Sequence, residues 1–127
     1  MNAAFTAPHT PQALAGLKVI ELGQLIAGPF AGKTLADFGA EVIKVEPPPS
    51  DGSPGGDPLR QWRMLHNGTS VWWQVQSRNK KSVVLDLRTD EGRETVARLI
   101  DEADVVIENF KPRSEERRVG KECRSRW

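Results

Sequence analysis

The chain has 127 residues, of which 38% are apolar and 28% are charged, and its formal net charge is +1. This composition suits one soluble domain, and the near-neutral charge argues against a nucleic-acid partner. No apolar run approaches the length of a membrane span, which argues against a membrane partner. The single cysteine, Cys123, leaves no disulfide framework, so we predict a reducing compartment and a cytoplasmic protein.

A βαβ unit is predicted near the start of the chain. Apolar strands over 17–22 and 41–45 flank a glycine-bounded turn over 23–28 and a helix that opens at Pro29 and closes at Gly39. Proline is tolerated at the first helical position because its missing N–H would be unpaired there, and glycine past the end stops the helix. Strands joined by a helical crossover are parallel, and ligands bind outside the carboxyl ends of such strands. The turn and the end of the second strand are therefore the first places to expect a site.

A long irregular segment follows. Residues 47–68 contain three consecutive prolines and a Gly/Pro/Ser/Asp cluster, which excludes regular structure for about fifteen residues. A loop of that length is usually functional or covers a partner. Thr69 or Ser70 can cap the segment 70–78, whose adjacent tryptophans leave helix and strand equally open.

The second half of the chain continues the alternation of strand and helix. The segment 82–87 is a nearly continuous apolar run, typical of a strand covered on both faces. Thr89 caps a helix over 90–102 with one apolar stripe, and a fourth strand covers 105–108. This order predicts an α/β fold, a Rossmann-like doubly wound parallel sheet with right-handed crossovers.

Three regions are expected along the chain. Residues 1–16 lack a charged start and an uninterrupted apolar core, so we interpret them as a disordered leader rather than a secretory signal. Residues 17–113 form the α/β domain. Residues 114–127 show no apolar period and are either a solvated basic tail or foreign sequence after a truncation, of which we favour the second.

One motif resembles a phosphate-binding loop but has the wrong chemistry. The segment 27–34 fits its relaxed form, with alanine for the first glycine, and 83–86 could be the magnesium-binding strand. However, Pro29 has no N–H to offer a phosphate, and Phe30 is bulky where the loop must close. An ATP-binding protein that depends on Lys33 is therefore a minor alternative.

Other ligand types leave weaker signals. Glu46 ends the second strand, where an acidic residue could bind ribose, but the glycine fingerprint of dinucleotide sites is missing. The helix N-terminus after the 23–28 turn could instead hold an anion or a carbonyl with its backbone N–H groups. Basic side chains could contact phosphates there, or form a solvated rim; they are Lys80, Lys81, Arg88 and Lys111.

The tryptophans and histidines give no strong signal for a bound ligand or a metal ion. Trp62, Trp72 and Trp73 are expected to pack in the core or an interface, with stacking on an adenine as the less favoured alternative. Neither His9 nor His66 lies beside a cysteine or carboxylate at ligand spacing, so no metal is predicted. No serine-hydrolase elbow motif is present either.

Four blocks in fixed order, AGPF, LADFGAEVIKVE, NKKSVVLDL and ADVVIENF, resemble the N-terminal part of the class III CoA-transferases. This CaiB/BaiF type includes formyl-CoA transferase and the α-methylacyl-CoA racemases, and the similarity covers about residues 17–112. The resemblance implies part of the large domain of an interlocked homodimer, with coenzyme A bound as an acyl-CoA substrate. It also implies transfer of CoA between a thioester and a carboxylic acid through an aspartate nucleophile.

The resemblance further implies where CoA would be contacted. Its contacts fall at three strand ends, on Ile26 and Ala27, on Leu85, Asp86, Leu87 and Arg88, and on Asn109, Phe110 and Lys111. A basic residue of formyl-CoA transferase is replaced by Pro47, so one phosphate contact is lost or supplied elsewhere.

No catalytic residue is assigned. The family's aspartate, like the racemases' acid/base pair, falls downstream of this sequence, so we expect no turnover from the chain alone. A transferase fragment, a racemase fragment and a non-catalytic CoA-binding module stay open, and the acyl donor and acceptor are not specified.

Overall fold

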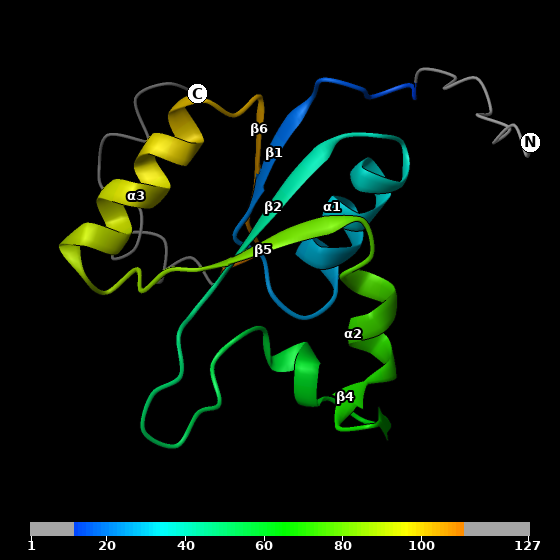
Figure 1. The fold of residues 1–127 in the computed structure, drawn as a ribbon, viewed down its shortest axis with the longest axis vertical. Helices are drawn as coiled ribbons and strands as arrows, with labels where there is room; N and C mark the ends of the chain where they lie inside the picture. Colours follow the sequence, from blue (N-terminus) through cyan, green and yellow to red (C-terminus); the bar gives the residue numbers. More distant parts are fainter. Residues whose placement is uncertain (1–11, 111–127) are drawn as a thin grey trace, which may run out of the picture.

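The computed structural model describes residues 12–110. Its centre is a four-stranded parallel sheet in the order β5-β2-β1-β6 (Figure 1). The strands are β1 Lys18–Glu21, β2 Glu41–Glu46, β5 Lys80–Val84 and β6 Val105–Ile107. The order confirms the prediction of a Rossmann-like, doubly wound α/β fold, because the chain moves outward from β1 in one direction and then crosses to its other side.

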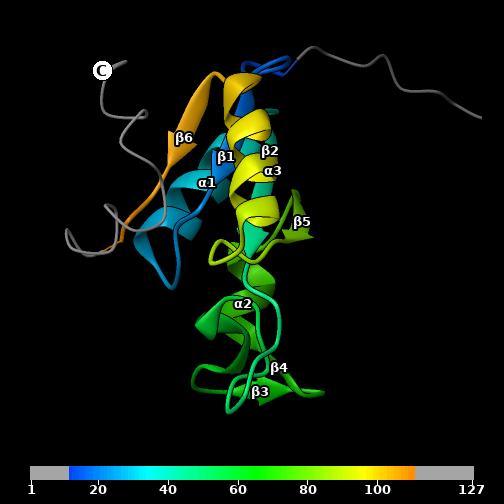
Figure 2. The same ribbon diagram turned by 90° about the vertical axis from the view of Figure 1, so that its left-hand side faces the viewer.

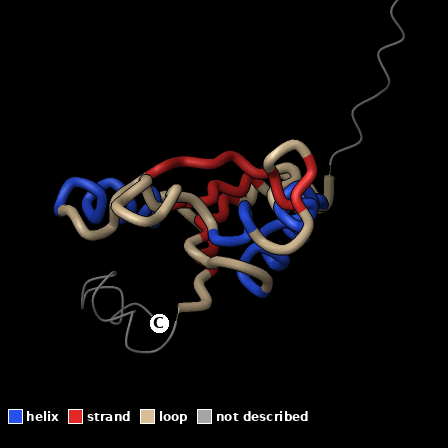
Figure 3. The backbone as a smooth tube through the Cα atoms, turned by 90° about the horizontal axis from the view of Figure 1, so that it is seen from below, coloured by secondary structure: helices blue, strands red, loops and turns tan. Residues whose placement is uncertain are grey.

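One helix covers each face of the sheet. Helix α1 (Ala27–Asp37) packs on the face that holds Val19 and Val42, whereas α3 (Asp90–Asp101) packs on the face that holds Ile20 and Val45. Seen from below, the strands lie between the helices (Figure 3). Adjacent strand residues point to opposite faces, so this alternation produces two separate apolar cores. Both are expected from the apolar runs of the strands.

Element boundaries differ from the prediction at two places. Helix α1 begins two residues early, at Ala27, so Pro29 occupies its third position, where a backbone N–H still has no intrahelical partner. The third strand, β5, also begins early, at Lys80, because its pairing with β2 aligns Val42 with Lys80. The residues after Val84 therefore belong to a loop rather than to a strand.

The expectation that this third strand is covered on both faces is wrong for residues 12–110. Strand β5 lies at the edge of the sheet, and the side chain of Val84 is 58% exposed. An apolar run shows that a strand can be buried, but it does not show its position in the sheet.

The long segment between β2 and β5 is more regular than predicted. It contains a 3-10 turn (η1, Pro58–Gln61), a small antiparallel pair (β3 Leu65–His66, β4 Thr69–Ser70) and a helix (α2, Val71–Gln76). This excursion extends beyond the end of the sheet (Figure 2). Asp57 caps η1 and Ser70 caps α2, and these side-chain caps are why short elements form in a proline-rich region.

The tryptophans of the excursion behave as packing residues. Trp73 is buried, and the guanidinium of Arg60 lies 3.9 Å from its ring centroid. Trp72 packs against Trp62 with ring centroids 6.0 Å apart, although it remains 43% exposed.

The N-terminal boundary needs a correction. Residues 12–16, assigned to the leader from the sequence, form a hydrogen-bonded turn in which the Leu14 N–H donates to the Phe38 carbonyl at 2.9 Å. Leu14 also packs on the core at the α1 face, and this apolar contact orders the turn. The predicted leader before residue 12 and the predicted tail after residue 113 lie outside the described residues. Within residues 12–110, no helix is long and apolar enough to cross a bilayer.

Candidate functional site

A cleft of about 200 Å³ lies at the carboxyl ends of the strands. Its walls come from the end of β1, the loop after β2, the loop after β5 and Phe110. It includes Leu85, Asp86, Leu87 and Arg88, together with Gln24 from the first turn. The sequence prediction that the ends of the third and fourth strands face one edge agrees with this geometry.

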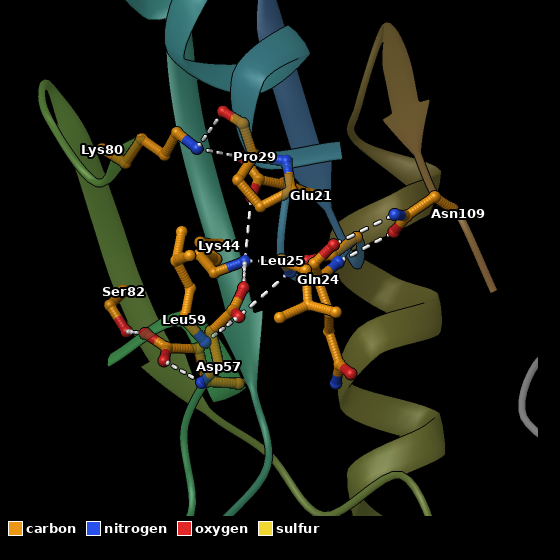
Figure 4. A network of polar contacts seen from close by, with 12 residues as sticks. Glu21, Gln24, Leu25, Pro29, Lys44, Asp57, Leu59, Lys80, Ser82 and Asn109 are labelled. Atoms are coloured by element: carbon orange, nitrogen blue, oxygen red, sulfur yellow. Dashed lines mark hydrogen bonds and ion pairs between the residues drawn. The ribbon is translucent and has the colours of Figure 1, made fainter. Parts of the chain in front are cut away.

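Other predicted site residues lie around the cleft rather than in its wall. Ile26 and Ala27 are exposed at the start of α1. Asn109 lies beside the turn, where its side-chain carbonyl accepts from the Gln24 N–H at 2.8 Å and its amide donates to the Gln24 carbonyl at 3.0 Å (Figure 4). The amide of Asn109 therefore supports the turn. Lys111 lies outside the described residues.

Two lysines predicted as phosphate contacts lie elsewhere. Lys80 is buried and its ammonium forms an ion pair with Glu21 at 2.6 Å, and burial lowers its pKa. Lys81 forms an ion pair with Glu41, which begins β2 at the opposite edge of the sheet. The prediction fails because both lysines lie at the start of β5, whereas the carboxyl edge is formed by the residues at the strand ends.

Among residues 12–110, Arg88 is the basic residue that lines the cleft. Its guanidinium forms two hydrogen bonds of 2.9 Å with the carboxylate of Asp86, and these lower the Asp86 pKa to about 2. The Arg88 side chain is 68% exposed, and exposed ion pairs of this kind are weak in water. The guanidinium can therefore exchange this partner for an anionic ligand.

The turn before α1 depends on two glycines. A Cβ atom on Gly23 would lie 2.7 Å from the Gly28 Cα and 2.9 Å from the Asn109 side-chain oxygen. Both glycines are thus required so that the two ends of the turn can touch. Leu25, between them, has a positive φ of 63°, which is unfavourable for a residue with a side chain.

A buried polar network lies beneath the turn (Figure 4). The ammonium of Lys44 contacts Glu21 at 2.9 Å, Asp57 at 2.8 Å and the Gly23 carbonyl at 2.7 Å. Sequence analysis missed this network, although charged residues inside the apolar strand β2 were a signal. Burial of such a charge is unfavourable unless it is paired with an opposite charge or hydrogen-bonded.

Glu46 belongs to the same network and is not free to bind ribose. Its carboxylate accepts from Arg60, from the Ser82 hydroxyl at 2.6 Å and from the Asp57 N–H at 2.7 Å. Burial by itself would raise the Glu46 pKa, but these hydrogen bonds outweigh it and lower the pKa to about 2. Glu46 is therefore not available to bind the ribose hydroxyls of a dinucleotide, and this disfavours the interpretation of the chain as a dinucleotide-binding domain.

The phosphate-loop interpretation is also disfavoured. The matching segment forms helix α1 instead of a loop, and the Lys33 ammonium forms an ion pair with Asp37 at 2.8 Å. In the described part of the chain, no group of three or more His, Cys, Asp or Glu side chains could hold a metal ion.

The fold and the cleft define an α/β domain with a candidate ligand site at the carboxyl edge of a parallel sheet. The family model of CoA-transferase family III matches residues 14–122. The chain belongs to this family, and the resemblance found in the sequence is confirmed.

Relatives and solved structures support this membership. The chain is 53% identical over 103 residues to succinyl-CoA–D-citramalate CoA-transferase of Chloroflexus aurantiacus, covering 80% of this chain and 24% of the relative. It is 45% identical over 111 residues to succinate–glutarate CoA-transferase of Agrobacterium fabrum, covering 82% of this chain and 26% of the relative. A CaiB/BaiF family protein of Brucella suis has a similar structure, with a TM-score of 0.73 and 45% identity over 84% of this chain and 28% of that one. The chain thus spans about a quarter of the length of the curated relatives it matches.

Proposed function

We propose that this chain forms the CoA-binding edge of a CoA-transferase that moves CoA between an acyl-CoA thioester and a carboxylic acid. The observation that carries the proposal is the cleft, because it gathers Leu85, Asp86, Leu87, Arg88 and Phe110 at one edge of the sheet. In a family of CoA-transferases, the natural ligand for this cleft is the coenzyme common to all their substrates.

The cleft suits both the less polar groups of CoA and its phosphates. Leu85, Leu87 and Phe110 offer apolar surface to the adenine and the pantetheine arm, and Arg88 offers a guanidinium to a phosphate. Ile26 and Ala27 lie at the N-terminus of α1, whose free N–H groups favour an anion or a carbonyl. Asn109 contributes by holding the turn, and Lys111 is proposed as a further contact.

The chemical step is assigned to residues beyond this chain. An attacking carboxylate must be free to approach a thioester carbonyl. Of the two acidic residues in the cleft wall, Glu46 is buried and held by Arg60, and the family resemblance makes Asp86 a CoA contact rather than the nucleophile. We therefore propose that the 127-residue chain binds CoA without acyl exchange, and that the complete protein is a cytoplasmic homodimer.

Isothermal titration of the chain with CoA tests the binding proposal. We expect measurable affinity that falls about tenfold in Arg88→Ala, since a charge-assisted hydrogen bond is lost. Arg98→Ala, which removes an exposed arginine from α3, is the matched control and should leave affinity unchanged. Absence of binding by the unmodified chain would refute the proposal.

A turnover assay separates the remaining alternatives. The purified chain is incubated with succinyl-CoA and a panel of carboxylic acids, and we expect no new CoA thioester. Exchange above the blank would contradict the assignment of the chemical step. Binding without exchange is also what a non-catalytic CoA-binding module would show. An aspartate block downstream in the uninterrupted gene would favour the transferase fragment, and its absence from the full locus would favour the module.

A further inference from the structure

We infer that Asp57 is a positioning residue that holds the turn before α1 in the conformation that binds CoA, and so couples the loop after β2 to the ligand. The inference deepens the proposed function and rests on it for the ligand. Asp57 itself does not line the cleft. Its effect would be transmitted through the backbone of Leu25.

The turn is held from three sides. Lys44 on β2 donates to the Gly23 carbonyl, and the side chain of Asn109 after β6 binds both the N–H and the carbonyl of Gln24. Asp57, which is far away in the sequence, accepts from the Leu25 N–H at 3.1 Å (Figure 4). These three contacts involve three successive residues of the turn.

Leu25 is the residue of the turn that most needs support. Its φ of 63° lies in the left-handed region, which side chains other than those of Asn and Asp adopt with difficulty. Such a conformation persists only when the surroundings over-determine it. The hydrogen bond from the Leu25 N–H to Asp57 provides that constraint.

Asp57 is fixed firmly enough to constrain the backbone of Leu25. The residue is 1% exposed, and its Oδ1 also accepts from the Leu59 N–H at 2.8 Å while its Oδ2 faces the Lys44 ammonium at 2.8 Å. Its own N–H is bound by Glu46 at 2.7 Å. Both carboxylate oxygens therefore have defined partners, and asparagine can satisfy only one side because its NH₂ group would face either a cation or another donor.

Because Gln24, Ile26 and Ala27 flank Leu25, relaxation of Leu25 would move each of them. Gln24 lines the cleft, and the other two carry the first N–H groups of α1. Loss of the Asp57 contact should therefore weaken CoA binding without removing any atom from the cleft wall.

The test combines CoA titration with residue-resolved hydrogen exchange by NMR on the full 127-residue chain. In Asp57→Asn we expect CoA affinity to fall about tenfold and exchange at Leu25 to accelerate, while the amides of β1 stay protected. Asp51→Asn, an exposed aspartate in the same loop, is the matched control and should change neither quantity. Alanine removes the Leu25 contact whichever way an asparagine amide is oriented, so Asp57→Ala is measured beside Asp57→Asn. Unchanged affinity and unchanged exchange in both variants would overturn the inference.

A double variant distinguishes positioning from general destabilisation. Glycine adopts a positive φ readily, so in the Leu25→Gly background the Asp57→Asn change should reduce CoA affinity by less than it does with leucine present. Equal losses in the two backgrounds would contradict transmission through Leu25.

The exchange measurement remains decisive if the CoA affinities of the unmodified chain and Asp57→Asn cannot be compared. If the unmodified chain does not bind CoA, the proposed function fails, and the exchange rates alone decide whether Asp57 orders the turn. If Asp57→Asn does not fold, the unmodified chain is used: slow exchange at the Leu25 amide supports the inference, and exchange at the rate of an unstructured amide overturns it.

Discussion

Replacement of Glu46 by glutamine should make the protein less stable at neutral pH and less sensitive to acid. The carboxylate is buried at the end of β2 and accepts hydrogen bonds from Arg60, Ser82 and Asp57. Glutamine has nearly the same shape but no charge, and its NH₂ group would face donors on one side. The substitution therefore removes the charge and some of the acceptor positions but leaves the packing in place.

The magnitude follows from the Glu46 pKa. A lowering from 4.5 to about 2 corresponds to about 3 kcal/mol of folding free energy. Because the pKa of the folded state is the lower one, this stabilisation is complete above pH 4.5 and is lost as the pH falls toward 2. The difference in stability between the two proteins should therefore shrink by about 1.4 kcal/mol for each pH unit below 4.5.

Urea unfolding followed by tryptophan fluorescence at pH 7, 4 and 3 measures this difference, since Trp73 is buried. Exposed Glu94 on α3 provides the control, and Glu94→Gln should unfold like the unmodified chain at each pH. A Glu46→Gln deficit that stays constant from pH 7 to pH 3 would refute the reasoning, because it would show that ionisation of Glu46 does not stabilise the fold.

Three further substitutions probe the buried polar groups, each by urea or thermal unfolding at pH 7. Gly32→Ala would place a Cβ atom 2.0 Å from the Glu21 carboxylate, so we expect a loss of about 1–3 kcal/mol. Lys44→Met leaves two buried carboxylates without their shared cation, and we expect a loss of about 3–5 kcal/mol. Gln76→Met removes a buried side-chain oxygen that has no hydrogen-bond partner within residues 12–110, so stability should be unchanged or rise by about 1 kcal/mol.

Each of these expectations has a contrary result. Full stability of Gly32→Ala would show that the Glu21 side chain relocates freely, and full stability of Lys44→Met would show that the network is dispensable. A clear loss in Gln76→Met would show that the amide makes a stabilising contact.

Much of the fold is readable from local pattern. Apolar runs, turn residues and helix caps locate β1, β2, α3 and β6 within about two residues, because each depends on neighbours along the chain. The alternation of strand and helix then predicts a parallel sheet, and its carboxyl edge predicts the general place of the site. The family also follows from sequence blocks, and the match over residues 14–122 confirms it.

The site is predicted only in part, and the failures share one cause. Lys80 and Lys81 were expected at the ligand edge, yet both face acidic partners that are distant in sequence. The amide of Asn109 is engaged by the Gln24 backbone, which the sequence did not indicate, and its contact with CoA stays a prediction. In each case the partner is set by strand order and register, which a local pattern does not specify.

The sequence by itself thus determined the βαβ alternation and the family, and it indicated the edge of the sheet where we propose a ligand binds, because all three follow from local periodicity and short motifs. Only the tertiary structure decided that Lys44, Glu46 and Asp57 form a buried network beneath the first turn. Lys44 and Glu46 lie on β2 and Asp57 lies in the loop that follows it. Burial makes each of these charges depend on partners that only the folded chain brings within hydrogen-bonding distance.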